Sequence, residues 1–146
     1  MNFRGGLSLA VANFDSNTVS VLRGKPDGSF GRPVQYAVGA NPEYVLAVDL
    51  NGDGQPDLVT ANLNSDTSVL QGKANGTFGA TTNYTVGSEP YWVAEADFNG
   101  DGTFQGATSF RTGGGLPTSI AVGLFNVDAK PDLAIANRCR STLVYC

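Results

Sequence analysis

The sequence predicts an all-β protein built from propeller-type, four-stranded blades, and three observations favour this fold class. The 146 residues include 19 glycines and only 15% charged residues, a composition typical of short strands joined by tight turns. A long segment of the chain occurs twice, with a period near 48 residues. No segment shows the 3.6-residue apolar period of an amphipathic helix.

The repeat is clearest in two segments, residues 18–54 and 67–102. From Leu22 and Leu70 onward the two segments align without a gap, 48 residues apart. Further upstream the spacing is 49, because "AVANFDSNT" faces "VTANLNSDT". A fixed period of this length indicates units that stack and bury a continuous core between neighbours.

A third copy of the repeat is incomplete. Phe104 follows Phe78 by only 26 residues, because the turn "DFNGDG" runs directly into "TFQGATSF". One "PDLVxAN" strand, one "TVSVL" strand and their loop are missing at this point. We interpret the chain as a single repeat domain, about three blades' worth of strands, that covers 1–146, with blade-like repeats at about 7–49 and 50–97 and an incomplete third repeat at 98–146.

The expected strands are short runs rich in Val, Leu, Thr and Tyr, several of them alternating as strands with one buried face do. In chain order they are "LSLAVAN" at 7–13, "TVSVL" at 18–22, "YVLAVDL" at 44–50, "DLVTANL" at 57–63 and "TTNYTV" at 81–86. Asp27-Gly28 and Asn75-Gly76 predict hairpin turns, in which glycine supplies a positive φ. Four strands per repeat of this length are typical of a propeller blade.

The motif combination "VDLNGDGQPDLVTAN" followed by "TSVLQGKANGTF" resembles the FG-GAP/VCBS repeats, the blades of integrin α-chain-like β-propellers. The resemblance covers about residues 6–146. It implies a β-propeller that binds calcium in a loop at the blade edge. It also implies an extracellular or cell-surface protein that adheres to proteins or glycans, although the N-terminus makes a poor signal peptide.

The segment "DLNGDGQPDL" at 49–58 is the strongest candidate site. The expected calcium ligands are the side chains of Asp49, Asn51, Asp53 and Asp57 and the carbonyl of Gln55. Calcium takes six to eight oxygen ligands, and three crowded carboxylates repel one another without a cation. An EF-hand is excluded because Thr60 stands where that motif requires Glu. The alternative is a polar turn, since Asn-Gly and Asp-Gly form turns without an ion.

Two further loops match the calcium pattern less well. Their weaker metal candidates are Asp97, Asn99 and Asp101 in "DFNGDGTFQ", and Asn126, Asp128 and Asp132 in "LFNVDAKPD". In the first loop Gln105 replaces the fourth carboxylate, so a hairpin turn without metal is favoured. In the second, Leu124 and Ala129 replace the first ligand and the turn glycine, so we expect no calcium there.

The sequence points to binding rather than catalysis. It has no histidine, which removes the commonest general base, and no nucleophile or phosphate-loop motif. Tyr44, Tyr91 and Trp92 follow Pro42 and Pro90 and are the candidate contacts to a protein or glycan partner. Their alternative role is to pack between neighbouring blades. A carbohydrate-active enzyme accessory domain is a further alternative function.

Composition also limits the partners. A formal charge of −4 argues against nucleic acid, and no apolar run is long enough to insert into a membrane. Cys139 and Cys146 could pair across a hairpin, but two cysteines form no disulfide framework.

Three blades' worth of strands do not close a propeller, which typically has four to eight blades. The terminal blade faces would stay exposed, so we expect a homo-oligomer. A partner that completes the ring, and a self-assembling structural subunit that grows into a filament, are the alternatives.

Overall fold

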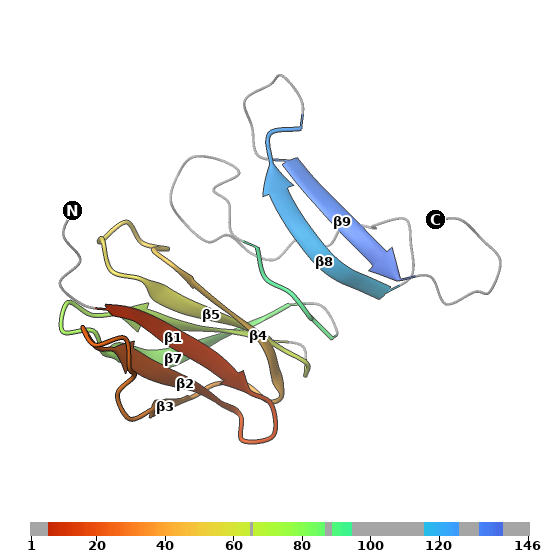
Figure 1. Ribbon diagram of the computed structural model, residues 1–146. Coiled ribbons are helices and arrows are strands. Elements are labelled where there is room, and N and C mark those ends of the chain that lie inside the picture. Colours follow the sequence, from red (N-terminus) through yellow and green to blue (C-terminus); the bar gives the residue numbers. More distant parts are fainter. Residues whose placement is uncertain (1–5, 65, 87–88, 95–115, 126–131, 139–146) are drawn as a thin grey trace.

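The computed structural model describes residues 6–64, 66–86, 89–94, 116–125 and 132–138. These residues contain strands, turns and loops and no helix, which confirms the predicted all-β class (Figure 1). The strands are β1 (Gly6–Asn13), β2 (Thr18–Gly24), β3 (Val34–Ala37), β4 (Pro42–Val48), β5 (Asp57–Asn62), β6 (Asp66–Gly72), β7 (Phe78–Thr85), β8 (Leu116–Gly123) and β9 (Asp132–Arg138).

The strands form three antiparallel sheets in which chain neighbours are sheet neighbours. Their orders are β1-β2-β3, β4-β5-β6-β7 and β8-β9. The second sheet is a complete four-stranded blade, as the repeat predicts. This blade begins at β4, so the hydrogen-bonded unit spans 42–85 and is displaced by one strand from the repeats at 7–49 and 50–97. The glycine-rich loop at 49–56 consequently lies inside a blade, between its first two strands.

The hairpin turns form where the sequence predicts them. Gly28 and Gly76 have φ values of +82° and +73°, a region that side chains with a Cβ rarely adopt. Each closes its turn by donating its N–H to a lysine carbonyl three residues earlier, at 3.0 Å from Gly28 to Lys25 and 2.7 Å from Gly76 to Lys73. The two turns are equivalent in the repeat, which explains why glycine recurs at this position.

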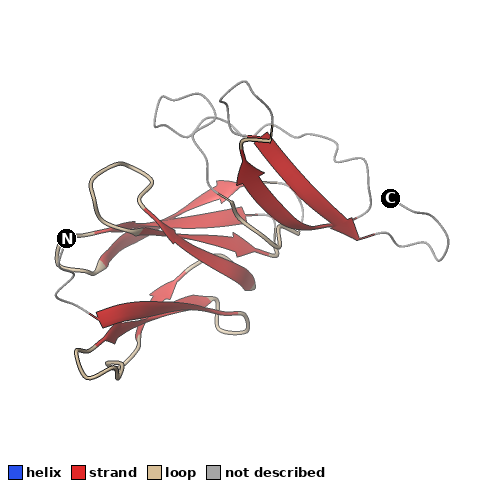
Figure 2. Ribbon diagram, turned by 45° about the horizontal axis from the view of Figure 1, so that its top comes forward, coloured by secondary structure: helices blue, strands red, loops and turns tan. Residues whose placement is uncertain are grey.

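The core lies between the first two sheets, which pack face to face (Figure 2). Val19 and Val21 of β2 meet Leu58 of β5 and Leu70 of β6, and all four side chains are buried. Partly buried side chains surround this centre, namely Ala10, Tyr36, Val38, Val45 and Phe78. Tyr36 and Phe78 make an edge-to-face pair with ring centroids 5.3 Å apart. Because side chains alternate along each strand, the apolar side chains on one face of each sheet point toward the neighbouring sheet.

The recurring Ala-Asn dipeptide ties each hairpin together. Asn13 donates its side-chain N–H to the Ser20 hydroxyl at 2.8 Å, and Asn62 donates to the Ser68 hydroxyl at the same distance. The backbone N–H of Gly39 also donates to Ser68 Oγ at 2.8 Å, which links the two sheets. Asn62 is fully buried, and its hydrogen bonds satisfy polar atoms that would otherwise be costly to bury.

The third repeat is described only in part. Its β8 and β9 pair in the register of β4 and β5, with Gly123 opposite Asp132 as Val48 is opposite Asp57. Residues 89–94, which match the start of β4 in the repeat, belong to no sheet. Asp97, Asn99, Asp101, Asn126, Asp128, Cys139 and Cys146 lie outside the described residues, and of Asp132 only the backbone is described. No helix that could span a bilayer occurs in the described ranges.

Candidate functional site

The loop between β4 and β5 is shaped by two glycines in the left-handed region. Gly52 and Gly54 have φ values of +73° and +79°. A Cβ at either position would meet nothing within 4 Å, so the requirement for glycine is conformational rather than steric. These residues bend the backbone so that its N–H groups point at side-chain oxygens of the same loop.

Asp49 organises the loop through its carboxylate. Its Oδ1 accepts the N–H groups of Gly52 at 2.9 Å and Asp53 at 3.2 Å, and its Oδ2 accepts that of Gly54 at 2.8 Å. Asn51 Oδ1 accepts the N–H of Asp53 at 3.0 Å, and Asp53 Oδ1 accepts that of Gln55 at 2.8 Å. The predicted ligand side chains therefore act here as acceptors for the backbone, and Asp49, Asn51 and Asp53 are exposed to solvent.

Asp57 has a different environment, at the base of the loop. It is the first residue of β5, and only 1% of its surface is exposed. Its Oδ2 accepts the N–H of Leu50 at 3.1 Å, and its Oδ1 accepts that of Gly72 in β6 at 2.7 Å. In the described part of the chain no Lys or Arg forms an ion pair with it. The carboxylate thus joins the loop to β5 and β6.

This structural role of Asp57 was not foreseen in the sequence, although a signal for it exists. An acidic residue opens the apolar run "DLVTAN", where burial makes an unpaired charge costly. Its partner Gly72 lies in "QGK", and a Cβ there would collide with the carbonyl oxygen of Pro56. The glycine lets the β6 backbone approach the start of β5 closely enough for the Asp57 hydrogen bond.

The donor set fits a hard cation in its chemistry. Three carboxylates and one amide supply only oxygen, the ligand type that calcium prefers. A carboxylate has about four lone-pair positions, and the hydrogen bonds of Asp49 use three of them, those of Asp57 two and that of Asp53 one. Acceptor capacity therefore remains. No three acidic, histidine or cysteine side chains of the described residues are grouped closely enough to hold an ion in this arrangement.

The aromatic candidates lie at the junction of repeats. Tyr44 of β4 stacks on Trp92 with ring centroids 4.1 Å apart and an angle of 25° between the planes. The two residues are 48 positions apart and therefore equivalent in the repeat. The stack matches the packing role that the sequence left open for them. Tyr91 and Trp92 nevertheless stay exposed and offer aromatic surface to solvent.

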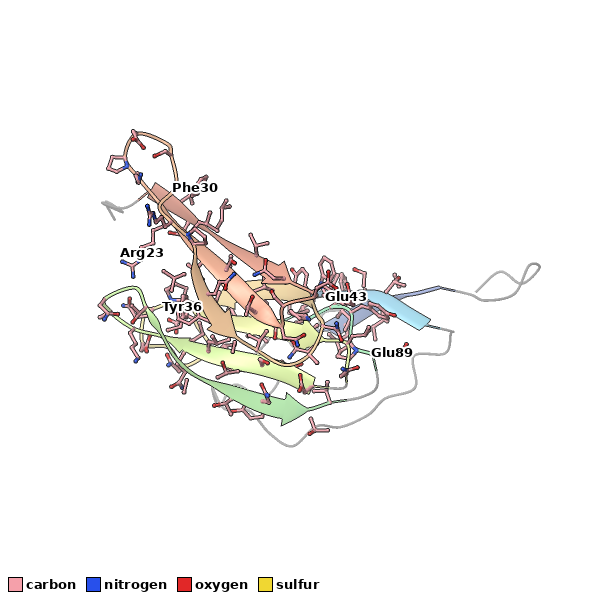
Figure 3. All side chains as sticks on the ribbon, turned by 90° about the horizontal axis from the view of Figure 1, so that it is seen from below. Arg23, Phe30, Tyr36, Glu43 and Glu89 are labelled. Carbon is pink, nitrogen blue, oxygen red and sulfur yellow. The ribbon has the colours of Figure 1, made fainter. Side chains whose placement is uncertain are left out.

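A cavity of about 340 Å³ adjoins these rings. Its lining includes Glu89, Tyr91 and Trp92, together with Thr67 of β6 and Ile120 of β8. Glu89 has a φ of +53°, and its repeat equivalent Asn41 has +55°. Asn tolerates this region better than Glu, so Glu89 adopts this backbone conformation at a small conformational cost. Figure 3 shows Glu89 and Glu43 at the same end of the sheets, away from Arg23.

The blade, the repeated turns and the loop between its first two strands define a β-propeller-like repeat module, although the described strands close no ring. The chain belongs to the FG-GAP-like repeat family, whose model matches residues 5–60 and 49–105. Both matched stretches contain the loop at 49–56. The comparisons with curated proteins and with solved structures each gave no match.

Proposed function

We propose that the chain is a calcium-stabilised, non-catalytic binding and adhesion module of the β-propeller type, active outside the cell. The observation that carries this function is the β4–β5 loop, a glycine turn whose three carboxylates and one amide accept backbone N–H groups. The family supports an extracellular module, and the absence of histidine from the sequence weighs against acid–base catalysis.

Calcium would be held by Asp49, Asn51, Asp53 and Asp57, with the carbonyl of Gln55 and water completing the shell. The ion supplies positive charge among carboxylates that otherwise have only N–H dipoles as partners. The chain's own contribution is the loop conformation. Asp49 fixes the turn through three N–H groups, and buried Asp57 anchors the loop to β6.

A calcium titration followed by thermal unfolding tests this site. Binding to the folded state alone raises stability by RT ln(1 + [Ca]/Kd), about 2.7 kcal/mol at 100 times Kd. We expect Tm to rise with calcium relative to EDTA and to stay nearly unchanged with magnesium. Asp53→Asn removes an exposed charge from the loop and should abolish the calcium-dependent rise. A wild-type Tm that is identical in millimolar calcium and in EDTA would refute the site.

The proposed partner surface is the cavity beside Tyr91 and Trp92. Aromatic faces bind sugar rings and apolar side chains through a large, rigid contact area, and Glu89 can accept hydrogen bonds from hydroxyl or amide groups. Trp92 is the single tryptophan of the chain, so its fluorescence reports on this site directly.

A glycan array followed by fluorescence titration of the best oligosaccharide tests the surface. We expect a saturable change in Trp92 emission that Tyr91→Ala weakens at least tenfold, while the exposed Thr82→Ala in β7 serves as a control. If no array ligand is found, a protein partner is the remaining class, to be sought with the wild type and Tyr91→Ala compared as baits. A ligand bound equally well by Tyr91→Ala would show that the surface lies elsewhere.

A further inference from the structure

The β1–β3 sheet has an apolar outer face, opposite the core, that no described part of the chain covers. Leu9 is 46% exposed and Phe30 is 40% exposed; Val11 is also exposed. The register places Leu22 of β2 directly opposite Leu9 of β1, so these side chains share one side of the sheet. We call Leu9, Val11, Leu22 and Phe30 the outer face. Figure 3 shows Phe30, in the segment between β2 and β3, beside the β1–β3 sheet, with Tyr36 between that sheet and β4–β7.

The same face is buried in the next blade. The repeat pairs Leu9 with Leu58, Leu22 with Leu70, and Phe30 with Phe78, at spacings of 49, 48 and 48 residues. In the second blade the two leucines are 2% and 0% exposed and belong to the core, and the phenylalanine packs against that core. Leu9 is therefore exposed where its equivalent Leu58 is covered, and Leu22 and Phe30 are less buried than Leu70 and Phe78.

The cover of the second blade shows what kind of surface fits the outer face. It is the inner side of the β1–β3 sheet, with Ala10 from β1, Val19 and Val21 from β2, and Tyr36 from β3. Small and β-branched side chains there leave room for the leucines, and the tyrosine meets the phenylalanine edge-on. The outer face thus matches another β-sheet that presents alanines at the Ala10 position.

The other end of the same chain offers such a sheet. "LAIAN" at 133–137 in β9 repeats "LAVAN" at 9–13 in β1, so Ala134 and Ala136 occupy the positions of Ala10 and Ala12. Both alanines are exposed. The alanine face of β8–β9 thus repeats the β1 part of this cover, whereas counterparts of Val19, Val21 and Tyr36 are not among its described residues.

We propose that the outer face of one molecule packs against the β8–β9 sheet of a second copy of this chain, head to tail. Such a contact is heterologous, since different surfaces meet, and it propagates until a ring closes or a filament forms. The inference goes beyond the proposed function, because neither calcium nor a ligand takes part in the contact.

Complementation between two variants tests the contact by sedimentation velocity over a wide micromolar range, in calcium and in EDTA. Leu9→Arg places a charge on the outer face, the head of the molecule, and Ala134→Arg places one on the alanine face of the β8–β9 sheet, its tail. Each variant alone should be monomeric, whereas the wild type forms dimers or larger assemblies. An equimolar mixture of the two variants should form a heterodimer and nothing larger, because one intact head meets one intact tail.

Two controls accompany the variants. Leu9→Met keeps the outer face apolar, and Thr82→Arg places the same charge on an exposed residue of β7, outside both contact surfaces; both should assemble like the wild type. Circular dichroism shows whether the arginine variants fold. A monomeric wild type, assembly that survives Leu9→Arg, or a mixture that stays monomeric would each overturn the proposal. Because the measurement is repeated in EDTA, its outcome is independent of the calcium site.

Discussion

Replacing Asp57 by Asn tests whether this carboxylate holds the blade together without any metal. The buried carboxylate accepts one N–H from Leu50 and one from Gly72. Asparagine has nearly the same shape but only one side-chain oxygen, and its NH₂ group would face one of these two donors. The substitution therefore removes one hydrogen bond and leaves a partly buried backbone N–H opposed by another donor.

The expected cost follows from these two contacts. A hydrogen bond to a charged group contributes about 1.5–3 kcal/mol, and leaving a buried donor unsatisfied costs about 1–3 kcal/mol. The two effects describe the same N–H in part, so we expect Asp57→Asn to lower the free energy of unfolding by about 2–4 kcal/mol. The full decrease in the free energy of unfolding should be seen in EDTA, since these hydrogen bonds do not depend on an ion.

Urea unfolding in EDTA and in calcium measures both roles. Asp53→Asn is the matched control, because the same atoms change on an exposed residue that accepts only the N–H of Gln55. In EDTA it should cost at most about 0.5–1 kcal/mol, and in calcium it should lose the calcium-dependent stabilisation. If Asp57→Asn were as stable as the wild type in EDTA, the assignment of the two hydrogen bonds to Asp57 would be wrong.

Three further predictions concern the buried core, the close contact between Gly72 of β6 and Pro56, and the hairpin turn that contains Asp27. Leu70→Ala should destabilise the chain by about 3 kcal/mol, and Leu22→Ala by less than half of that where the chain is monomeric; equal losses in urea unfolding would contradict the difference in burial. Gly72→Ala should cost about 2 kcal/mol, because its Cβ collides with a backbone carbonyl, and an unchanged Tm would refute this. Hydrogen bonds from the Ser29 hydroxyl and N–H lower the pKa of Asp27 below its ordinary 3.8. The stability that these bonds contribute is therefore present above pH 3.8 and is lost as the pH falls through the lowered pKa of the folded state. Ser29→Ala should return the NMR titration midpoint of Asp27 toward 3.8, and an unchanged midpoint would show that Ser29 does not cause the shift.

Local features of the fold follow directly from the sequence. Asp27-Gly28 and Asn75-Gly76 form turns where expected, because a positive φ is a local requirement that glycine meets without help from the rest of the chain. Strand positions follow from alternation, which is also local. The blade boundary did not follow, because a repeat can be divided at any point and only the hydrogen bonds show that the sheet starts at β4.

For the candidate site, too, the sequence predicted the local features and missed a contact between distant residues. The spacing of Asp49, Asn51 and Asp53 identified a tight loop rich in oxygen acceptors, and in the structure each of these side chains accepts a backbone N–H of that loop. The spacing gave no sign that Asp57 is buried, because its partner Gly72 is 15 residues away along the chain. Calcium binding at this loop stays a prediction.

The sequence by itself determined five of the strands, the hairpin turns and the order of the repeat, because these depend on backbone preferences and on periods of two residues within a strand. Only the tertiary structure decided which copies of a repeated side chain are buried. Leu58 and Leu9 stand at the same position of the same motif, yet one is 2% and the other 46% exposed. Burial depends on whether a neighbouring sheet is present, and a residue's own sequence does not carry that information.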